Sequence, residues 1–343
     1  MSPRALLILG VLALAAVVGV WLTHGDREDP PAVTGNPLVP GLLDELNEVS
    51  AVTIRRAGGE VVARLEREAE GDWRVRNRWD YPADHGLLRG MLIALGEARR
   101  AEGRTSNPEH WQRLGVEEID DADATGMEVE LEGDGLSHRV IIGRQAGAGE
   151  GTFARLADSD ASWLIDQRID RYHAIGDWLD SRVVDIPVDD VVAVDLEPEA
   201  GGSVSVRPEP ESVAGFELVG VPADAELLTP TIARSLVRVV TELEFIDVRP
   251  RSDAEPLEPV GVARYEARDG FVLYIHSYTL PEDGNAGAVR FEAEATEDAD
   301  EAVRERAATL TRQWQGWVYR LPEHKYVNAT QTLDGVVVDS TTP

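Results

Sequence analysis

The chain has 343 residues, and its 63 acidic side chains against 33 Lys and Arg give a formal net charge of -30. A surface this negative repels nucleic acid and anionic lipid headgroups, which excludes a nucleic-acid-binding protein. The absence of cysteine excludes disulfides, zinc-thiolate sites, iron–sulfur clusters and thiol nucleophiles. Lys325 is the only lysine, which excludes a Walker A loop and leaves little scope for Schiff-base chemistry. The acidic residues are spread along the whole chain, which favours general solubility or salt adaptation over an acidic face for a cationic partner.

The N-terminus carries an apolar run from Ala5 to Leu22, preceded by Arg4 and followed by a net acidic stretch. As a helix this run would be about 27 Å long, close to the roughly 30 Å hydrocarbon core of a bilayer. Basic charge before the run and acidic charge after it orient the N-terminus inward. Residues 1–23 are therefore predicted to be a single transmembrane anchor in the inner membrane, with the N-terminus in the cytoplasm and the bulk of the chain in the periplasm.

A cleaved signal peptide is the competing interpretation of this segment. Cleavage needs small residues directly after the apolar core, whereas this core ends in Val20-Trp-Leu-Thr-His24. Ala13 and Ala15 lie too deep in the apolar run to serve. The sequence therefore favours a retained signal anchor, and Trp21 fits the interfacial position of amphipathic aromatics. Residues 24–50 are predicted to be a proline-rich linker and a short helix.

An internal repeat organises the rest of the chain. Pro82-Ala-Asp84 followed by Leu87-Leu88 recurs, with the same spacing, as Pro222-Ala-Asp224 followed by Leu227-Leu228. Apolar strand-like runs and glycine pairs precede both copies: Ala51–Ile54 with Gly58-Gly59, and Val191–Val194 with Gly201-Gly202. Repetition in the same order predicts a duplicated module. The predicted domains are a first module over residues 51–187, a second over 188–333, and a tail over 334–343.

Alternating and helical patterns define the elements of each module. Each is expected to form antiparallel hairpins with a packed helix, with Asp84 as N-cap or first-turn acid in the first copy. The fold class is therefore α+β: two tandem copies of a mainly antiparallel, strand-rich module with packed helices, preceded by the transmembrane helix. The expected strands are 51–57, 60–67, 72–77, 127–131, 138–142, 152–156, 262–267, 271–277 and 289–295; the expected helices are 87–95, 227–243 and 299–313.

Catalytic signatures are missing from the sequence. The seven histidines form no His-Glu-x-x-His pair, no Gly-x-Ser-x-Gly elbow occurs, and no glycine-rich fingerprint joins a strand to a helix. Pairs of carboxylates arise by chance among so many acids. We therefore assign no catalytic, cofactor-binding or metal-binding residue, and predict that the protein is not an enzyme.

One segment imitates a calcium loop. Asp121, Asp123, Thr125, Gly126 and Glu132 have the spacing of ligands in an EF-hand loop. The apolar position of that loop is occupied by Glu128, however, and residues 127–132 alternate as a strand. We interpret the segment as an acidic loop before a strand.

The C-terminal region is rich in aromatic residues. Such density could dock a partner, and the candidate partner-binding residues are Trp314, Trp317, Tyr319 and Tyr326. The alternative is a final strand and turn that pack over the domain core.

Four features together resemble the bacterial family known as domain of unknown function 4340. They are the N-terminal apolar helix, the Trp73 strand leading to Pro82-Ala-Asp84 and a leucine-rich helix, the segment Ser106-Asn-Pro-Glu-His-Trp-Gln-Arg-Leu-Gly115, and the ending Gly316-Trp-Val-Tyr-Arg-Leu-Pro-Glu-His-Lys-Tyr326. The resemblance implies a membrane-anchored envelope component, since many members are encoded beside gliding-type ABC transporter subunits. It transfers no catalytic residue, because the family has no assigned site.

Two functions are consistent with these observations. The first is a non-enzymatic, periplasm-facing accessory protein that binds a membrane partner, such as an ABC-type transporter complex. The second is an envelope enzyme or ligand-binding protein that uses an acidic cleft between the two modules. The lack of a catalytic signature favours the first.

Overall fold

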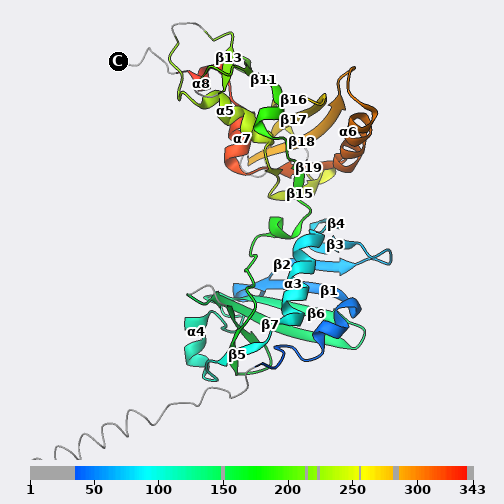
Figure 1. The fold of residues 1–343 in the computed structure, drawn as a ribbon, viewed down its shortest axis with the longest axis vertical. Helices are drawn as coiled ribbons and strands as arrows, with labels where there is room; N and C mark the ends of the chain where they lie inside the picture. The colour runs from blue at the N-terminus through cyan, green and yellow to red at the C-terminus, as the bar shows by residue number, and fades with distance from the viewer. Residues whose placement is uncertain are drawn as a thin grey trace, which may run out of the picture. The chain divides into compact units, whose positions relative to one another are not determined.

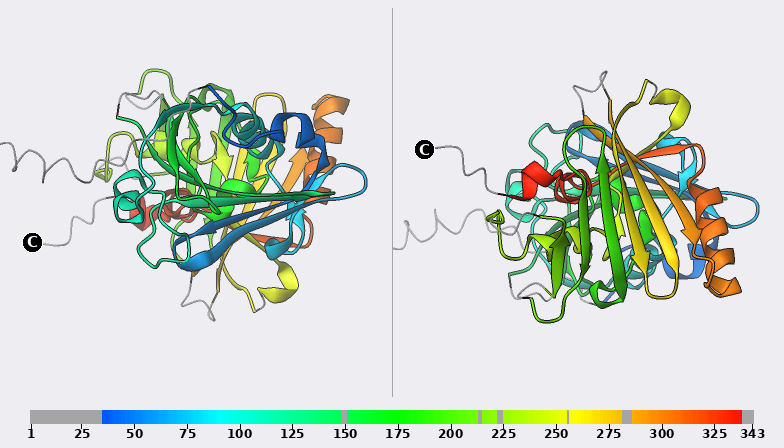
Figure 2. Two further views of the ribbon diagram at one scale, coloured as in Figure 1. Left: turned by 90° about the horizontal axis from the view of Figure 1, so that it is seen from below. Right: turned by 90° about the horizontal axis from the view of Figure 1, so that it is seen from above.

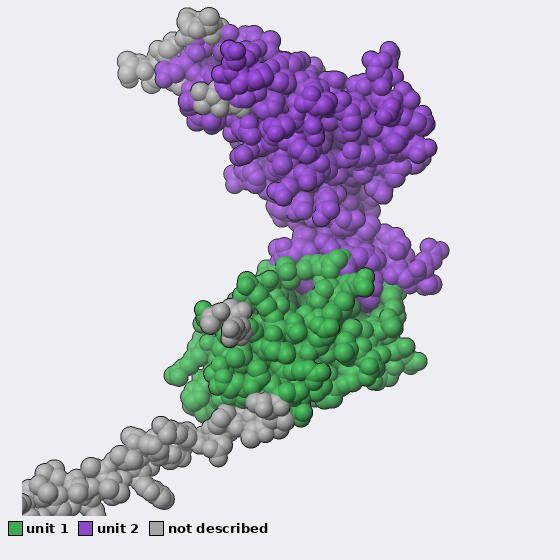
Figure 3. All heavy atoms as spheres, viewed as in Figure 1, with its two compact units in different colours: residues 1–67, 86–173 green, residues 68–85, 174–343 purple. Residues whose placement is uncertain are grey.

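The computed structural model describes residues 35–147, 151–212, 215–221, 225–254, 256–280 and 286–337. By their internal contacts these residues form two compact units (Figure 3). Unit 1 comprises the described residues within Met1–Arg67 and Gly86–His173, and unit 2 those within Glu68–His85 and Ala174–Pro343. The predicted anchor at residues 1–23 and the second Pro-Ala-Asp at residues 222–224 lie outside the described residues, and the predicted domain boundaries stay a prediction.

Unit 1 is built on an antiparallel sheet (Figure 1). Its strands follow the order β2-β1-β6-β7-β8-β9-β5. Gly58 and Gly59 both take a positive φ between β1 and β2, which confirms the predicted glycine turn. The strands are β1 Val49–Arg56, β2 Glu60–Arg67, β5 Arg100–Gly103, β6 Met127–Gly133, β7 Leu136–Gln145, β8 Thr152–Leu156 and β9 Ser162–Ile165.

The main helix beside this sheet is α3, His85–Glu97, whose first residue is grouped with unit 2. It begins directly after Asp84, and it buries Leu88, Met91, Leu92 and Leu95 at helical spacing, so the predicted helix is confirmed. Shorter turns complete unit 1: α2 Leu42–Glu45, η1 Leu46–Glu48, η2 Ala57–Gly59, η4 Pro108–His110 and α4 Trp111–Leu114.

Unit 2 also contains a large antiparallel sheet, of order β13-β12-β11-β16-β17-β18-β19-β15 (Figure 2). Phe271, Leu273 and Ile275 alternate inward along one of its central strands and are fully buried. The strands are β11 Val191–Pro198, β12 Val204–Pro208, β13 Phe216–Val219, β15 Asp247–Pro250, β16 Glu258–Ala267, β17 Phe271–Leu280, β18 Ala286–Ala295 and β19 Trp317–Arg320; β10 Arg182–Val184 pairs separately with β14 Leu243–Glu244.

The helices of unit 2 cover its sheet at two places. Helix α5 packs against β11, β12 and β13, and helix α6 packs against β17 and β18. They are α5 Ile232–Val237, α6 Glu301–Trp314, α7 Glu323–Ala329 and α8 Leu333–Val336, with 3₁₀ turns η5 Ile175–Trp178, η6 Val188–Asp190, η7 Arg238–Val240 and η8 Arg251–Asp253.

The helix predicted over residues 227–243 is wrong in its extent. Leu227 instead forms a β-bridge with Val337, and Leu228 is exposed. Pro230 explains the difference, because proline disfavours helical geometry in the residue before it. The helix therefore begins at Ile232 and ends, through η7, at Val240.

A short hairpin from early in the chain belongs to unit 2. Strands β3 Trp73–Val75 and β4 Tyr81–Pro82 pair antiparallel and are joined by η3 Arg76–Arg78 and two further residues. This hairpin carries the first Pro-Ala-Asp motif to the end of β4. It also positions the side chains described in the next section.

The mixed α+β class with mainly antiparallel sheets is confirmed for the described residues. In this part of the chain, none of the helices combines the length and apolarity that crossing a membrane would require.

Candidate functional site

The candidate partner-binding residues near the C-terminus lie at different depths in unit 2. Trp314, at the end of α6, and Tyr319, on β19, are buried, and both pack against the ring of Phe291. Trp317 and Tyr326 are only partly buried. Trp314 and Tyr319 thus contribute to the core of unit 2, as the packing interpretation expects, and partner binding by any of the four stays a prediction.

Tyr81, on strand β4, connects the early hairpin to this aromatic core. Its ring meets Trp317 edge-on at a centroid distance of 5.1 Å, and it meets Phe245 edge-on at 5.5 Å. Edge-to-face pairs of this kind stabilise beyond the area that they bury. Burial raises the pKa of the Tyr81 hydroxyl to about 12. The hairpin therefore forms part of the hydrophobic core of unit 2.

Trp79 stands at the turn of the same hairpin, and its side chain is 46% exposed. Trp79 and Asp80 both adopt left-handed backbone geometry, with φ of 51° and 57°. This geometry costs roughly 1–2 kcal/mol for each non-glycine residue, so the surroundings must enforce it.

Two ion pairs brace this turn. Arg78 Nε donates to Asp247 Oδ1 of β15 at 3.1 Å, and Arg76 Nη1 donates to Asp80 Oδ1 at 3.0 Å. The turn is thus held between the aromatic core beneath it and an edge strand of the sheet. The result is a large aromatic side chain exposed on a turn that these contacts hold. Trp79 could not be predicted as a site residue from the sequence, because its exposure and its left-handed backbone depend on the folded hairpin.

Lys325 and Tyr326 make structural contacts within the C-terminal motif. The Lys325 Nζ donates hydrogen bonds to the carbonyl oxygens of Arg238, Val239 and Thr241, at 2.7, 3.0 and 2.7 Å. These carbonyls end helix α5 and η7, where a cation is favoured. Burial lowers the pKa of Lys325. Tyr326 donates to the Tyr278 carbonyl at 2.9 Å.

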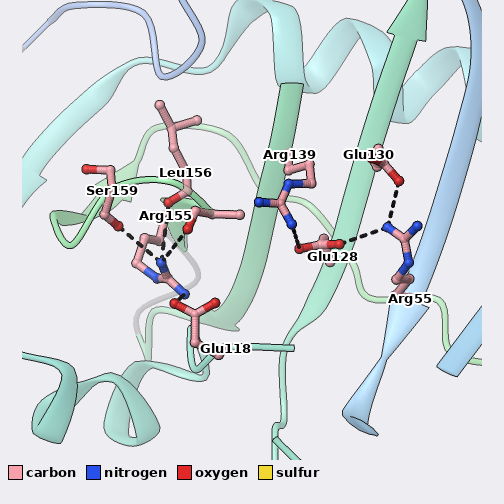
Figure 4. A network of polar contacts seen from close by, with 9 residues as sticks. Arg55, Glu118, Glu128, Glu130, Arg139, Arg155, Leu156 and Ser159 are labelled. Atoms are coloured by element: carbon pink, nitrogen blue, oxygen red, sulfur yellow. Dashed lines mark hydrogen bonds and ion pairs between the residues drawn. The ribbon is translucent and has the colours of Figure 1, made fainter. Parts of the chain in front are cut away.

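Arg155, on β8 of unit 1, is a buried arginine that is 1% exposed (Figure 4). Its guanidinium donates to the carbonyl oxygens of Val116, Leu156, Ala157 and Ser159, at 2.9, 3.4, 3.2 and 3.1 Å. Its Nη2 lies 3.0 Å from the carboxylate of Glu118. Burial lowers the pKa of Arg155, and the Glu118 carboxylate acts in the opposite direction.

The segment Ser106–Gly115 contacts this guanidinium through Trp111. Trp111 stacks on it, with the Arg155 Cζ 3.8 Å from the ring centroid, and donates through Nε1 to the Asp160 carbonyl at 3.2 Å. Asn107 caps η4 by accepting from the Glu109 amide at 3.0 Å. Gly115, with φ of 72°, ends α4 in the left-handed geometry that favours glycine. Each of these contacts is structural.

A second charged network crosses three strands of unit 1 (Figure 4). Arg55 on β1 pairs with Glu128 and Glu130 on β6 at 3.0 and 2.7 Å, and Arg139 on β7 lies 3.9 Å from Glu128. Glu128 is almost fully buried. Neighbouring strands of one sheet thus carry opposite charges in register, which stabilises the pairing.

Asp180 is one of the remaining acidic groups, and its pKa is shifted. Burial, with the nearby Asp84 carboxylate, raises the pKa of Asp180, while Arg182 and His85 act against the increase. No group of three or more His, Asp or Glu side chains among the described residues is arranged to hold a metal ion. In the segment with calcium-loop spacing, strand β6 begins at Met127. Glu132 is therefore a strand residue, as the sequence predicts.

A protein-family model matches a large part of the chain. The model of a family described as "Domain of unknown function (DUF4340)" matches residues 73–263, more than half of the chain. No curated protein and no solved structure matches. The matched range includes the early hairpin, the segment around Trp111 and the first strands of unit 2.

Proposed function

From the premise that this chain belongs to the DUF4340 family, we propose that it is a non-enzymatic accessory protein of the bacterial envelope. Residues 1–23 anchor it in the inner membrane, with the N-terminus in the cytoplasm and the globular region in the periplasm. The apolar run from Ala5 to Leu22 and its flanking charges support this placement. The partner is a membrane protein complex, and a transporter of the ABC type fits the resemblance noted from the sequence.

One observation carries the partner-binding part of this proposal: Trp79 is exposed on a left-handed turn whose neighbouring arginines form ion pairs. Tryptophan, tyrosine and arginine dominate the binding energy of protein interfaces. A rigid side chain loses little conformational entropy on binding. The backbone at Trp79 is in the left-handed region, which is unfavourable for a non-glycine residue, and ion pairs of Arg76 and Arg78 hold the turn. These are the properties of an interface anchor.

The proposal includes two tandem copies of one module. The unit 1 strands run β2-β1-β6-β7-β8-β9-β5, and the unit 2 strands, apart from the end strand β13, run β12-β11-β16-β17-β18-β19-β15. When these strands of each unit are numbered in the order in which they follow one another along the chain, the two sheets have the same strand order. In each unit a helix, α3 or α5, precedes the edge strand, β5 or β15. A duplicated binding module with two sheets offers a large docking area without any catalytic site.

A pull-down from native membranes tests the function. The tagged full chain is solubilised in mild detergent, and captured proteins are identified by mass spectrometry. We expect a transporter-type membrane complex with the wild type and its loss with Trp79→Ala. The matched control is Leu228→Ala, which removes another exposed apolar side chain of unit 2 and should leave capture unchanged. Recovery of no such complex by the wild type would overturn the proposal, and equal capture by Trp79→Ala would overturn the role of Trp79.

A further inference from the structure

An acidic hollow of about 500 Å³ lies in unit 1, between the segment around Trp111 and the loop that precedes β6. Its charged lining consists of the carboxylates of Glu109, Glu117, Glu118, Asp121 and Asp123. Trp111 and Pro108 contribute the apolar part of the lining. A concave surface that combines several like charges with apolar walls concentrates ions of the opposite charge.

Most of these carboxylates have no basic partner among the residues that the structure describes. Glu118 pairs with Arg155 at 3.0 Å. Among the described residues no arginine, lysine or histidine forms an ion pair with Glu109, Glu117, Asp121 or Asp123. Gathering four uncompensated negative charges opposes folding, so a cation at this place would relieve the repulsion.

Glu117 is the second and independent sign of a ligand. Its side chain lines the hollow but is only 9% exposed. Its Oε1 accepts a long hydrogen bond of 3.4 Å from the Thr125 hydroxyl. Its Oε2 is buried and has no hydrogen-bond partner in the described part of the chain. A buried carboxylate oxygen without a partner is costly, because it loses hydration and gains nothing in return.

We propose that this hollow binds an organic cation, an alkylammonium or guanidinium group, with the Glu117 carboxylate as its anchor. A bare metal ion fits poorly, because no three acidic side chains in the described residues are arranged to hold one. Apolar walls suit a ligand with a carbon stem and a charged head. Two residues that line the hollow already bind a guanidinium in this way, since Arg155 stacks on Trp111 and pairs with Glu118.

The cationic group could belong to one of two kinds of ligand: a free polyamine, or a basic side chain of a polypeptide. The inference does not depend on the anchor or on the partner proposed above. Isothermal titration calorimetry tests the proposal on the purified full chain in detergent. The probes are spermidine, the peptide Arg-Arg-Arg and CaCl₂. A salt concentration of 0.15 M screens non-specific attraction. We expect saturable binding of spermidine or the peptide, weakened about tenfold or more by Glu117→Gln. Binding of spermidine identifies the polyamine source, and binding of the peptide alone identifies the polypeptide source.

The matched control is Glu305→Gln, which removes one exposed acidic charge from α6 in unit 2. Equal weakening by both variants would show non-specific attraction and would overturn the proposal, as would the absence of binding by either organic probe. Saturable binding of CaCl₂ that Glu117→Gln abolishes would overturn the choice of an organic cation. Asp123→Asn, at an exposed position of the lining, is the second variant if Glu117→Gln does not fold, and it should weaken binding several-fold.

Thermal unfolding without ligand gives a separate readout. Glu117→Gln should raise the melting temperature, because it replaces an unpaired buried charge by a neutral group of the same shape. Spermidine or the peptide should raise the melting temperature of the wild type and not that of the variant. A variant that melts lower than the wild type, or that responds equally to the ligand, would contradict the role of Glu117.

Discussion

Tyr81 of the early hairpin packs edge-on against Trp317 of the C-terminal motif, with ring centroids 5.1 Å apart and an interplanar angle of 85°. Two segments from opposite parts of the chain thus build one aromatic core in unit 2. Both segments contain motifs on which the resemblance to the family rests. Their contact gives a physical reason why the two motifs occur in the same sequence. It also places the exposed Trp79 on a rigid base.

The aromatic contacts of Tyr81 should contribute strongly to the stability of unit 2. Tyr81→Ala should lower the free energy of unfolding by about 3–5 kcal/mol, because it removes a buried aromatic ring. Tyr81→Phe keeps the edge-to-face packing and should cost less than about 1.5 kcal/mol. Urea unfolding followed by tryptophan fluorescence measures both. Similar losses for the two variants would show that the hydroxyl, rather than the ring, stabilises the contact.

Arg155 should be essential for the loop architecture of unit 1. Arg155→Ala leaves four backbone carbonyls and Glu118 without their donor, and the expected cost is about 3–5 kcal/mol. Arg155→Lys should recover only part of it, since an ammonium cannot reproduce the planar fork of donors or the stacking on Trp111. In the Arg155→Ala variant, amide hydrogen exchange should become faster than in the wild type for residues 106–118, and this increase should be larger than in unit 2. Protection equal to the wild type in that segment would contradict this role.

Lys325 provides a specific chemical probe, because it is the only lysine of the chain. Its Nζ is engaged by three carbonyl oxygens, so acetylation by an N-hydroxysuccinimide ester should be slow in the folded protein and fast in denaturant. Mass spectrometry measures the rate. A lysine introduced by Glu305→Lys, at an exposed position of α6, should react at least tenfold faster under the same conditions. Comparable rates at the two positions would show that Lys325 is not held as described.

The stability of unit 2 should depend on the ionisation of Asp180. Its pKa is raised by partial burial and by Asp84, but the residue stays exposed to solvent, so the folded state favours the protonated carboxyl only modestly. This contribution is complete below the unfolded pKa, near 3.8, and is lost as the pH rises through the higher folded pKa. Asp180→Asn should therefore melt at a higher temperature than the wild type at pH 7, and the gain should vanish below about pH 3.8. Asp298→Asn, at an exposed position, should show no such gain; an equal gain there would indicate a general charge effect.

Much of the fold follows from local patterns in the sequence. The long hairpins around Gly58-Gly59 and along Phe271–Ala295 alternate clearly, and the structure confirms them. The short edge strand β5 was missed, because a few residues at a sheet edge do not show a period. The helix predicted from Leu227 is wrong at its start, because Pro230 disfavours helical geometry in the residue before it despite the apolar spacing.

The site residues were harder to predict, for a different reason. Arg155 and Trp111 meet only in the folded chain, and so do Tyr81 and Trp317. The segment Ser106–Gly115 was recognised as a motif, but its role around a buried guanidinium depends on β8. The exposure of Trp79 and the burial of Glu117 are properties of tertiary structure that a single sequence does not encode locally.

The central claim is that this protein binds a membrane complex through the surface around Trp79. Site-specific photo-cross-linking in living cells tests it most directly, with p-benzoylphenylalanine at position 79 and, as the control, at position 228. We predict a cross-linked product at position 79 that mass spectrometry identifies as an inner-membrane transporter subunit, and no such product at position 228. The absence of a membrane-protein product at position 79, or the same product from both positions, would contradict the claim.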